Sequence, residues 1–203
     1  VLAGGTSLIQ CVDTSGKTVL PITRDIPDLV AQLRSLAEDH HIVVLASGDP
    51  LFHGIGTTLL KYFDCRDLVI HPNISSIGAA FSRIKEPWHD AKIISLHAKG
   101  GTDFSFETLK TAPKLAFLTG PTTGPQYVAA QLIQAGVTDC QLCVIEQIGH
   151  PEKEKIQLFS DLNAVKGHTF QAPNIVIVKV SAPETPSVSR ETLVLRPRIL
   201  CLG

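Results

Sequence analysis

Apolar and polar positions alternate with two different periods along the first two thirds of the chain. Short apolar runs that stop at glycine, proline or small polar residues predict buried strands at residues 42–46, 68–71, 92–97 and 115–119. Segments with apolar residues at helical spacing lie beside these runs, at residues 26–41, 75–84, 104–111 and 126–136. Because alternating strands and helices are typical of a parallel sheet with crossover helices, the pattern predicts an α/β fold.

The last third of the chain has a different pattern. Strand-like runs follow one another with little helix between them, at residues 140–149, 155–160 and 174–180. This texture predicts a second subdomain built on a mixed sheet. We therefore expect two α/β subdomains, the first with a mostly parallel sheet and the second with a mixed one.

Loops rich in glycine and proline mark the candidate division between the subdomains, near residues 97–102 or 119–125. We place the division at the first of these loops. The expected units are an amino-terminal subdomain, a carboxy-terminal subdomain and a tail or linker rich in proline, serine and charge, at residues 1–99, 100–180 and 181–203.

The composition is that of a folded globular chain. Of the 203 residues, 44% are hydrophobic and 18% are charged, which excludes an intrinsically disordered chain. The 18 Lys and Arg residues nearly balance the 19 Asp and Glu residues, so we expect neither a nucleic-acid partner nor a membrane partner. No apolar run approaches the roughly 18 to 20 residues that span a bilayer, and the first residues lack the pattern of a secretory signal. The chain contains no methionine, which indicates a natural start further upstream.

Cysteine and histidine usage indicates a reduced protein without a bound metal. The five cysteines are odd in number and scattered, which argues against a disulfide framework and predicts a cytoplasmic location. Cys140 and Cys143 form a C-x-x-C, but neither a second pair nor a histidine at ligand spacing accompanies it. We therefore expect both to be core cysteines of a strand.

One loop carries the strongest local signal. The sequence ASGDPLFHGIGTTLLKYF joins an apolar run to a helix through Gly48, Asp49 and Pro50, followed by Gly54 and Gly56. Glycines allow a ligand to approach the backbone closely, and the start of a helix offers free N–H groups. The third glycine of a dinucleotide fingerprint is absent, as is any phosphate-cradling G-x-x-x-x-G-K-[ST]. An ordinary strand–turn–helix connection explains the same residues, so the loop alone does not identify a ligand.

Other strand ends also carry small polar residues. Ser75 and Ser76 open a helix, where they serve either as caps or as ligand contacts. Thr119 ends a strand in LTGPTTGPQ, and Gln147 leaves a strand in VIEQIGHPEKEKI. Because open α/β sheets bind ligands beyond the carboxyl ends of their strands, these ends predict one lined cleft. No nucleophile–base–acid set accompanies them, so hydrolytic chemistry lacks support.

The order of these motifs is more specific than any one of them. GDPLFHGIG, PNISSIGAAFSRIKEPWHDAKIISLH, LTGPTTGPQ and VIEQIGHPEKEKI, in this order, resemble the tetrapyrrole (corrin/porphyrin) methylase family. Within it, the chain is most similar to the branch that methylates carbon 5 of a precorrin in cobalamin (vitamin B12) biosynthesis. The resemblance implies a methyltransferase that uses S-adenosyl-L-methionine in a cleft between its subdomains, releases S-adenosyl-L-homocysteine and forms a homodimer.

The resemblance also assigns residues to the cofactor. Contacts with it are expected at Gly48, Asp49, Pro50, Phe52, Ser75, Ser76, Leu118, Thr119, Gln147 and Ile148. The segment at residues 173–175 is expected to close the site. A polycarboxylate substrate requires cations, for which Arg24, Arg83 and Lys99 are candidates, although ordinary surface charge explains each of them. No catalytic base is assigned.

The chain departs from the family at its amino end, and two other functions stay open. The family opens with a strand and a G-x-G-P-G loop, and neither precedes the VLAGG segment here. Bifunctional relatives continue into a second domain that methylates carbon 15 and decarboxylates, so a fused or separate domain of that kind is an expected partner. The alternatives are the same fold acting on another tetrapyrrole position or another substrate, and a non-catalytic module that binds S-adenosyl ligands.

Overall fold

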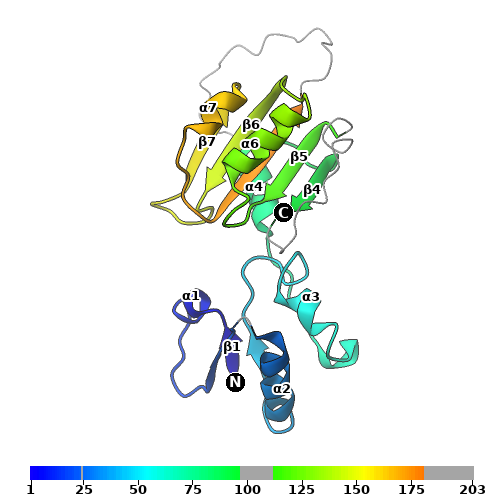
Figure 1. Cartoon of the computed structure of the whole chain (residues 1–203). Coiled ribbons are helices and arrows are strands. Elements are labelled where there is room, and N and C mark those ends of the chain that lie inside the picture. The colour runs from blue at the N-terminus through cyan, green and yellow to red at the C-terminus, as the bar shows by residue number, and fades with distance from the viewer. Residues whose placement is uncertain (24, 97–111, 181–203) are drawn as a thin grey trace, which may run out of the picture.

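The computed structural model describes residues 1–23, 25–96 and 112–180, and its strands form two sheets (Figure 1). The first sheet has the strand order β2-β1-β3, and both of its strand pairs are parallel. The elements of this first unit are β1 (Leu2–Gly4), α1 (Thr6–Ile9), β2 (Val19–Pro21), α2 (Ile26–Ala37), β3 (Val43–Val44), α3 (Ile55–Leu59) and the 3-10 helix η1 (Cys65–Asp67).

Helix α2 supplies much of the core of the first unit. Its N-cap is Asp25, whose side chain accepts a hydrogen bond from the Asp28 backbone N–H. The apolar positions of its inner face are one turn apart, so Leu29 and Leu33 are both buried and pack with Ala3 of β1 and Leu59 of α3.

The second sheet has five strands in the order β4-β5-β8-β6-β7. β4 and β5 are parallel, and the other neighbouring pairs are antiparallel, which confirms the predicted mixed sheet. The elements of this second unit are α4 (Ser76–Ile84), β4 (Ala91–Ser95), β5 (Lys114–Leu118), α6 (Pro125–Gln134), β6 (Cys140–Glu146), β7 (Lys155–Phe159), α7 (Leu162–Lys166) and β8 (Asn174–Val180).

Successive side chains of the second sheet point to opposite faces, and helices cover both. Helices α6 and α7 lie across one face, where Val128 and Val165 pack with Phe117 of β5 (Figure 1). Helix α4 lies against the opposite face, where Phe81 packs with Ala116, the neighbour of Phe117 in the strand. All five side chains are fully buried.

Among the described residues, no helix is both long and apolar enough to cross a membrane.

The apolar run at residues 68–71 was expected to be a strand, and this prediction is wrong. These residues lie outside regular secondary structure. Leu68 packs on the core of the first unit, whereas Val69 is 81% exposed. Within the described part of the chain β3 pairs only with β1, so the run has no neighbouring strand with which to exchange hydrogen bonds. The helix expected at residues 104–111 lies outside the described residues.

Sheet membership changes earlier in the chain than the expected division at residue 99. β4 pairs with β5 and α4 packs on the five-stranded sheet, although both were placed in the first unit. By sheet membership, the first unit therefore ends before α4. The sequence did not reveal this because the pairing of β4 with β5 joins residues far apart in the chain, whereas periodicity reports only local structure. The candidate loop at residues 97–102 and the tail at 181–203 lie outside the described residues.

Candidate functional site

The ends of three strands meet at one edge of the five-stranded sheet. Leu118, the last residue of β5, pairs with Ile175, and Glu146, the last residue of β6, pairs with Asn174. Because β8 runs antiparallel to both neighbours, the segments that leave β5 and β6 emerge beside the segment that enters β8. The register therefore brings together two of the strand ends that the sequence singled out.

The turn before β8 ties these two strand ends together. The Thr119 hydroxyl donates to Asn174, with Oγ1 2.6 Å from the carbonyl oxygen and 2.8 Å from Oδ1. Gln147 donates its backbone N–H to the carbonyl of Pro173 at 2.8 Å and its Nε2 to the carbonyl of Ala172 at 2.6 Å. Gln147 has φ 49°, in the left-handed region, so these two bonds hold a backbone conformation that a non-glycine residue rarely adopts.

The loop after β3 lies against the segment that opens α4. Gly48 has φ 73°, and a Cβ atom added there would lie 3.4 Å from the Ile74 carbonyl oxygen and 3.7 Å from Ser75 Cα. The Asp49 carboxylate accepts a long hydrogen bond from the Asn73 backbone N–H at 3.4 Å. The two backbone segments therefore pack closely at Gly48, with a gap that a single methyl group would fill, and the positive φ favours glycine at this position.

The backbone of Pro50 lies very close to two later glycines of the same loop. A Cβ atom added to either Gly54 or Gly56 would lie 2.7 Å from the Pro50 carbonyl oxygen. The loop thus folds back onto the start of α3 so closely that neither glycine has room for a side chain. The glycines after Asp49 serve this close approach of two backbone segments.

One of the two serines at the start of α4 caps the helix. Ser75 is the N-cap of α4, and its Oγ accepts a hydrogen bond from the Gly78 backbone N–H at 3.0 Å, which confirms the capping interpretation for this residue. A hydroxyl that caps by accepting still has its own proton to donate. Ser76 is the first residue of the helix, where backbone N–H groups have no partner within the helix.

The apolar residues of the expected site meet on one cluster. Phe52, Leu118 and Ile148 are partly buried and pack against a cluster of buried side chains that includes Ile77 of α4 and Ile145 of β6. Phe52 comes from the loop of the first unit, whereas the other residues belong to the second. This cluster therefore joins the two units beside the strand ends.

The contacting groups that these segments offer are mostly neutral. Apart from the Asp49 carboxylate they are backbone groups, hydroxyls, an amide and apolar side chains, which suit a ligand with both polar and apolar parts. The apolar cluster that Phe52 joins lies on the same side of the molecule as these polar groups. Among the described residues, no group of three or more His, Cys, Asp or Glu side chains is placed to hold a metal ion.

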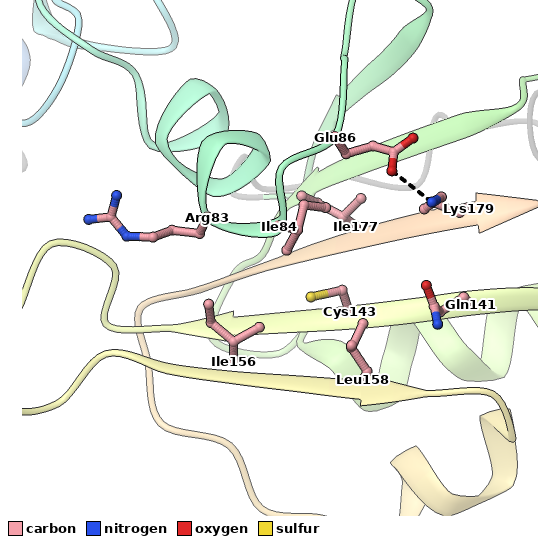
Figure 2. A pocket seen from close by; sticks show the side chains of 9 residues that line it. All are labelled: Arg83, Ile84, Glu86, Gln141, Cys143, Ile156, Leu158, Ile177 and Lys179. Carbon is pink, nitrogen blue, oxygen red and sulfur yellow. Dashed lines mark hydrogen bonds and ion pairs between the residues drawn. The ribbon is translucent and has the colours of Figure 1, made fainter. Parts of the chain in front are cut away.

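A separate pocket of about 220 Å³ lies on the α4 side of the five-stranded sheet (Figure 2). None of the expected cofactor residues lines it. Its charged side chains are paired, with Arg83 Nε 2.6 Å from Glu154 Oε1 and Lys179 Nζ 2.7 Å from Glu86 Oε2. Burial raises the pKa of the Cys143 thiol in its floor to about 11, so the thiol is protonated and unreactive. We therefore place the candidate site at the strand ends and not in this pocket.

The candidates for substrate-binding cations are only partly described. Arg83 lines the pocket of Figure 2 and pairs with Glu154, whereas Arg24 and Lys99 both lie outside the described residues. Cys140 and Cys143 are buried, which confirms that both are core cysteines. Glu146 lies at a strand end, as the motif VIEQIGHPEKEKI predicts, but its burial was not expected.

The fold and the candidate residues together define a class: a two-sheet α/β protein whose candidate ligand-contacting residues lie where its strand ends meet. The chain belongs to the Tetrapyrrole (Corrin/Porphyrin) Methylases, whose family model matches residues 13–160. The family expected from the order of the motifs is therefore confirmed.

Two curated relatives are about one third identical to this chain over the residues that align. A cobalt-precorrin-7 C(5)-methyltransferase from Salmonella typhimurium is 34% identical over 135 residues, which cover 66% of this chain and 65% of that protein. A decarboxylating precorrin-6Y C(5,15)-methyltransferase from Sinorhizobium is 33% identical over 129 residues, which cover 64% of this chain and 30% of that protein. The chain thus matches slightly less than two thirds of the length of the first relative.

Solved structures of more distant proteins have the same fold. The uroporphyrin-III C-methyltransferase of Thermus thermophilus, complexed with S-adenosyl homocysteine, superposes with a TM-score of 0.70 at 18% identity, covering 88% of this chain and 84% of that chain. The precorrin-6Y methylase of Archaeoglobus fulgidus superposes with a TM-score of 0.63 at 17% identity, covering 90% and 85%. These likenesses confirm the tetrapyrrole-methylase-like α/β fold.

Proposed function

We propose that this protein transfers a methyl group from S-adenosyl-L-methionine to carbon 5 of a precorrin or cobalt-precorrin in cobalamin biosynthesis. The observation that carries this proposal is the 34% identity over 135 residues to a relative named for that ring position. The relative named for positions 5 and 15 matches with 33% identity over 30% of its length, which favours carbon 5 over other positions because both names share it.

The site supports the use of this cofactor. S-adenosyl-L-methionine supplies a methyl group on a positively charged sulfur, so that transfer breaks a sulfur–carbon bond and forms a carbon–carbon bond. A donor that is already activated needs alignment and the exclusion of water more than an acid or base. In this proposal the backbone at Gly48 contacts the cofactor, and Thr119 holds one edge of the site. The side chains of Phe52, Leu118 and Ile148 exclude water.

Binding of S-adenosyl-L-homocysteine, measured by calorimetric titration, is the first test. The variant Gly48→Ala should abolish or strongly weaken binding because its methyl group enters the space between the two loops. Gly16→Ala is a matched control, since Gly16 has a similar positive φ of 68° but nothing within 4 Å of an added Cβ. Equal binding by the two variants, or no binding by the unaltered protein, would overturn the cofactor assignment.

The second test identifies the reaction. With ¹³C-methyl-labelled cofactor and late precorrin intermediates, the proposal expects one labelled methyl group at carbon 5, located by NMR of the product. Label at another carbon would favour a different member of the family. Binding of the cofactor without methylation of any precorrin would favour a non-catalytic S-adenosyl-binding module.

The proposed cellular location rests on the free thiols of the chain, and the proposed oligomeric state rests on its resemblance to the family. We infer a metal-free homodimer in the cytoplasm, where unpaired thiols such as the exposed Cys11 and Cys65 persist. We also infer that a fused or separate domain methylates carbon 15. Light scattering after size-exclusion chromatography tests the dimer, and a monomer at micromolar concentration would contradict it.

A further inference from the structure

We propose that Glu146 is a positioning residue that orients the turn at residues 171–174 and, through it, Thr119 at the cofactor site. This inference rests on the proposed function, because it concerns the same site. Glu146 does not itself contact the cofactor in this proposal. It acts on the site through a continuous series of hydrogen bonds that the structure shows.

Glu146 is the last residue of β6 and is only 3% exposed, although it carries a carboxylate. Burial of a charge is costly unless the charge accepts hydrogen bonds, and here each oxygen has a donor. Oε1 accepts from Gln157 Nε2 of β7 at 2.5 Å, and Oε2 accepts from the Gln171 backbone N–H at 2.6 Å. The carboxylate therefore links the edge strand of the sheet to the start of the turn.

The series continues from Gln171 to the site. The Gln171 backbone is held on both sides, because its carbonyl accepts from Asn174 Nδ2 at 3.0 Å while its N–H donates to Glu146. The bond to Nδ2 fixes which way the Asn174 amide points, so that Oδ1 faces the Thr119 hydroxyl at 2.8 Å. A change at Glu146 is thus transmitted through Gln171 and Asn174 to Thr119.

If Glu146 had only a structural role, loss of either of its hydrogen bonds would affect stability and ligand binding in the same way. The two bonds lead to different places, however. The bond from Gln157, here called the Gln157 arm, leads to the edge strand, whereas the bond from Gln171, the Gln171 arm, leads to Thr119. In this proposal only loss of the Gln171 arm weakens ligand binding. This difference allows the positioning role to be separated from a contribution to stability.

The test measures the dissociation constant for S-adenosyl-L-homocysteine, together with the midpoint of unfolding, for the full chain and its variants. Glu146→Asp keeps the charge but withdraws the carboxylate by about 1.5 Å, the length of one carbon–carbon bond, and should weaken binding about tenfold. Glu146→Gln retains an acceptor for the Gln171 N–H and an amide that can bond to Gln157, so it should bind within about twofold of the unaltered protein.

Two further variants act as control and as second test. Gln157→Ala removes the hydrogen bond to Glu146 Oε1 from the edge strand and exposes that oxygen to water. It should therefore lower the unfolding midpoint but leave the affinity for S-adenosyl-L-homocysteine unchanged. Asn174→Ala removes both side-chain bonds of the series that leads to Thr119 without disturbing the buried carboxylate. The bond from Thr119 to the backbone carbonyl of residue 174 remains, so this variant should weaken binding, but by less than Glu146→Asp. It therefore also tests the proposal if Glu146→Asp does not fold.

The outcomes are distinct. Weak binding by Glu146→Asp and Asn174→Ala, with near-normal binding by Glu146→Gln and Gln157→Ala, supports the positioning role. Normal affinity in Asn174→Ala or in folded Glu146→Asp overturns it, as does an equal loss in Gln157→Ala. If the unaltered protein does not bind S-adenosyl-L-homocysteine at all, the proposed function fails and this inference fails with it.

Discussion

The close approach of Pro50 to Gly54 gives the sharpest prediction about the loop of the first unit. Gly54 is the N-cap of α3, with φ −103° and ψ 179°, and a Cβ atom added there would lie 2.7 Å from Pro50 O, 2.9 Å from Asp49 O and 3.0 Å from Pro50 C. All three are backbone atoms, so no side-chain rotation relieves the contact. Gly54→Ala must therefore displace the backbone at Asp49 and Pro50.

The expected cost can be isolated with a matched control. Gly5 is also an N-cap glycine in an extended conformation, with φ −65°, but nothing lies within 4 Å of an added Cβ. Both substitutions replace glycine by alanine at an N-cap, so their difference reports the clash alone. Overpacking of this kind costs about 1–3 kcal/mol. Gly54→Ala should accordingly be about 2 kcal/mol less stable than Gly5→Ala, or roughly 4–8 °C lower in Tm.

Thermal and urea unfolding, followed by circular dichroism, measure this difference in free energy. Titration with S-adenosyl-L-homocysteine should also show weaker binding by Gly54→Ala, because the displaced residues belong to the proposed cofactor site. A difference between the two variants below about 0.5 kcal/mol, the range of ordinary surface substitutions, would refute the argument from close approach. Normal binding by a destabilised Gly54→Ala would show that the loop does not contact the ligand.

Other predictions concern single contacts of the second unit. Thr119→Val removes the hydroxyl that donates to Asn174 and should cost about 1–2 kcal/mol in urea unfolding and weaken ligand binding; unchanged values in both assays would contradict the network at the strand ends. The Arg83 guanidinium holds the pKa of the Glu154 carboxyl below its ordinary value, so this pair stabilises the fold above that ordinary pKa. Arg83→Gln should therefore cost about 0.5 kcal/mol at neutral pH, and the difference from the unaltered protein should vanish as the pH falls through the lowered pKa of Glu154. Iodoacetamide at pH 8 should label the exposed cysteines of the native protein but not Cys143, whose labelling by mass spectrometry before unfolding would contradict its burial.

Local patterns in the sequence predicted much of the second sheet and the polar ends of its strands. β5 and β6 are apolar runs whose last residues precede Thr119 and Gln147, and such a boundary between apolar and polar residues is visible without any structure. The rule that ligands lie beyond strand ends then placed these residues together. β1 and β2 were not expected, because strands of three residues are too short to show a period.

Other features depend on pairing between distant residues and were not accessible in this way. The run at residues 68–71 has the composition of a strand, but a strand forms only where a neighbour exchanges hydrogen bonds with it. β4 was assigned to the first unit because the glycine-rich loop at residues 97–102 follows it, whereas its register with β5 places it in the second. The partners of Glu146, at residues 157 and 171, are likewise set by the tertiary fold.

The two halves of the candidate site are held in different ways, and this difference bears on how each should respond to change. At the strand ends, the geometry is fixed by strand register and by short hydrogen bonds from Gln171 to Glu146 and from Thr119 to Asn174. The loop of the first unit is joined to this half by the packing of Phe52, and to the segment before α4 by the 3.4 Å bond that Asp49 accepts from Asn73. Both contacts constrain distance more than direction. Substitutions at the strand ends should therefore alter the orientation of a bound ligand, whereas substitutions in the loop should alter how closely the two units approach it.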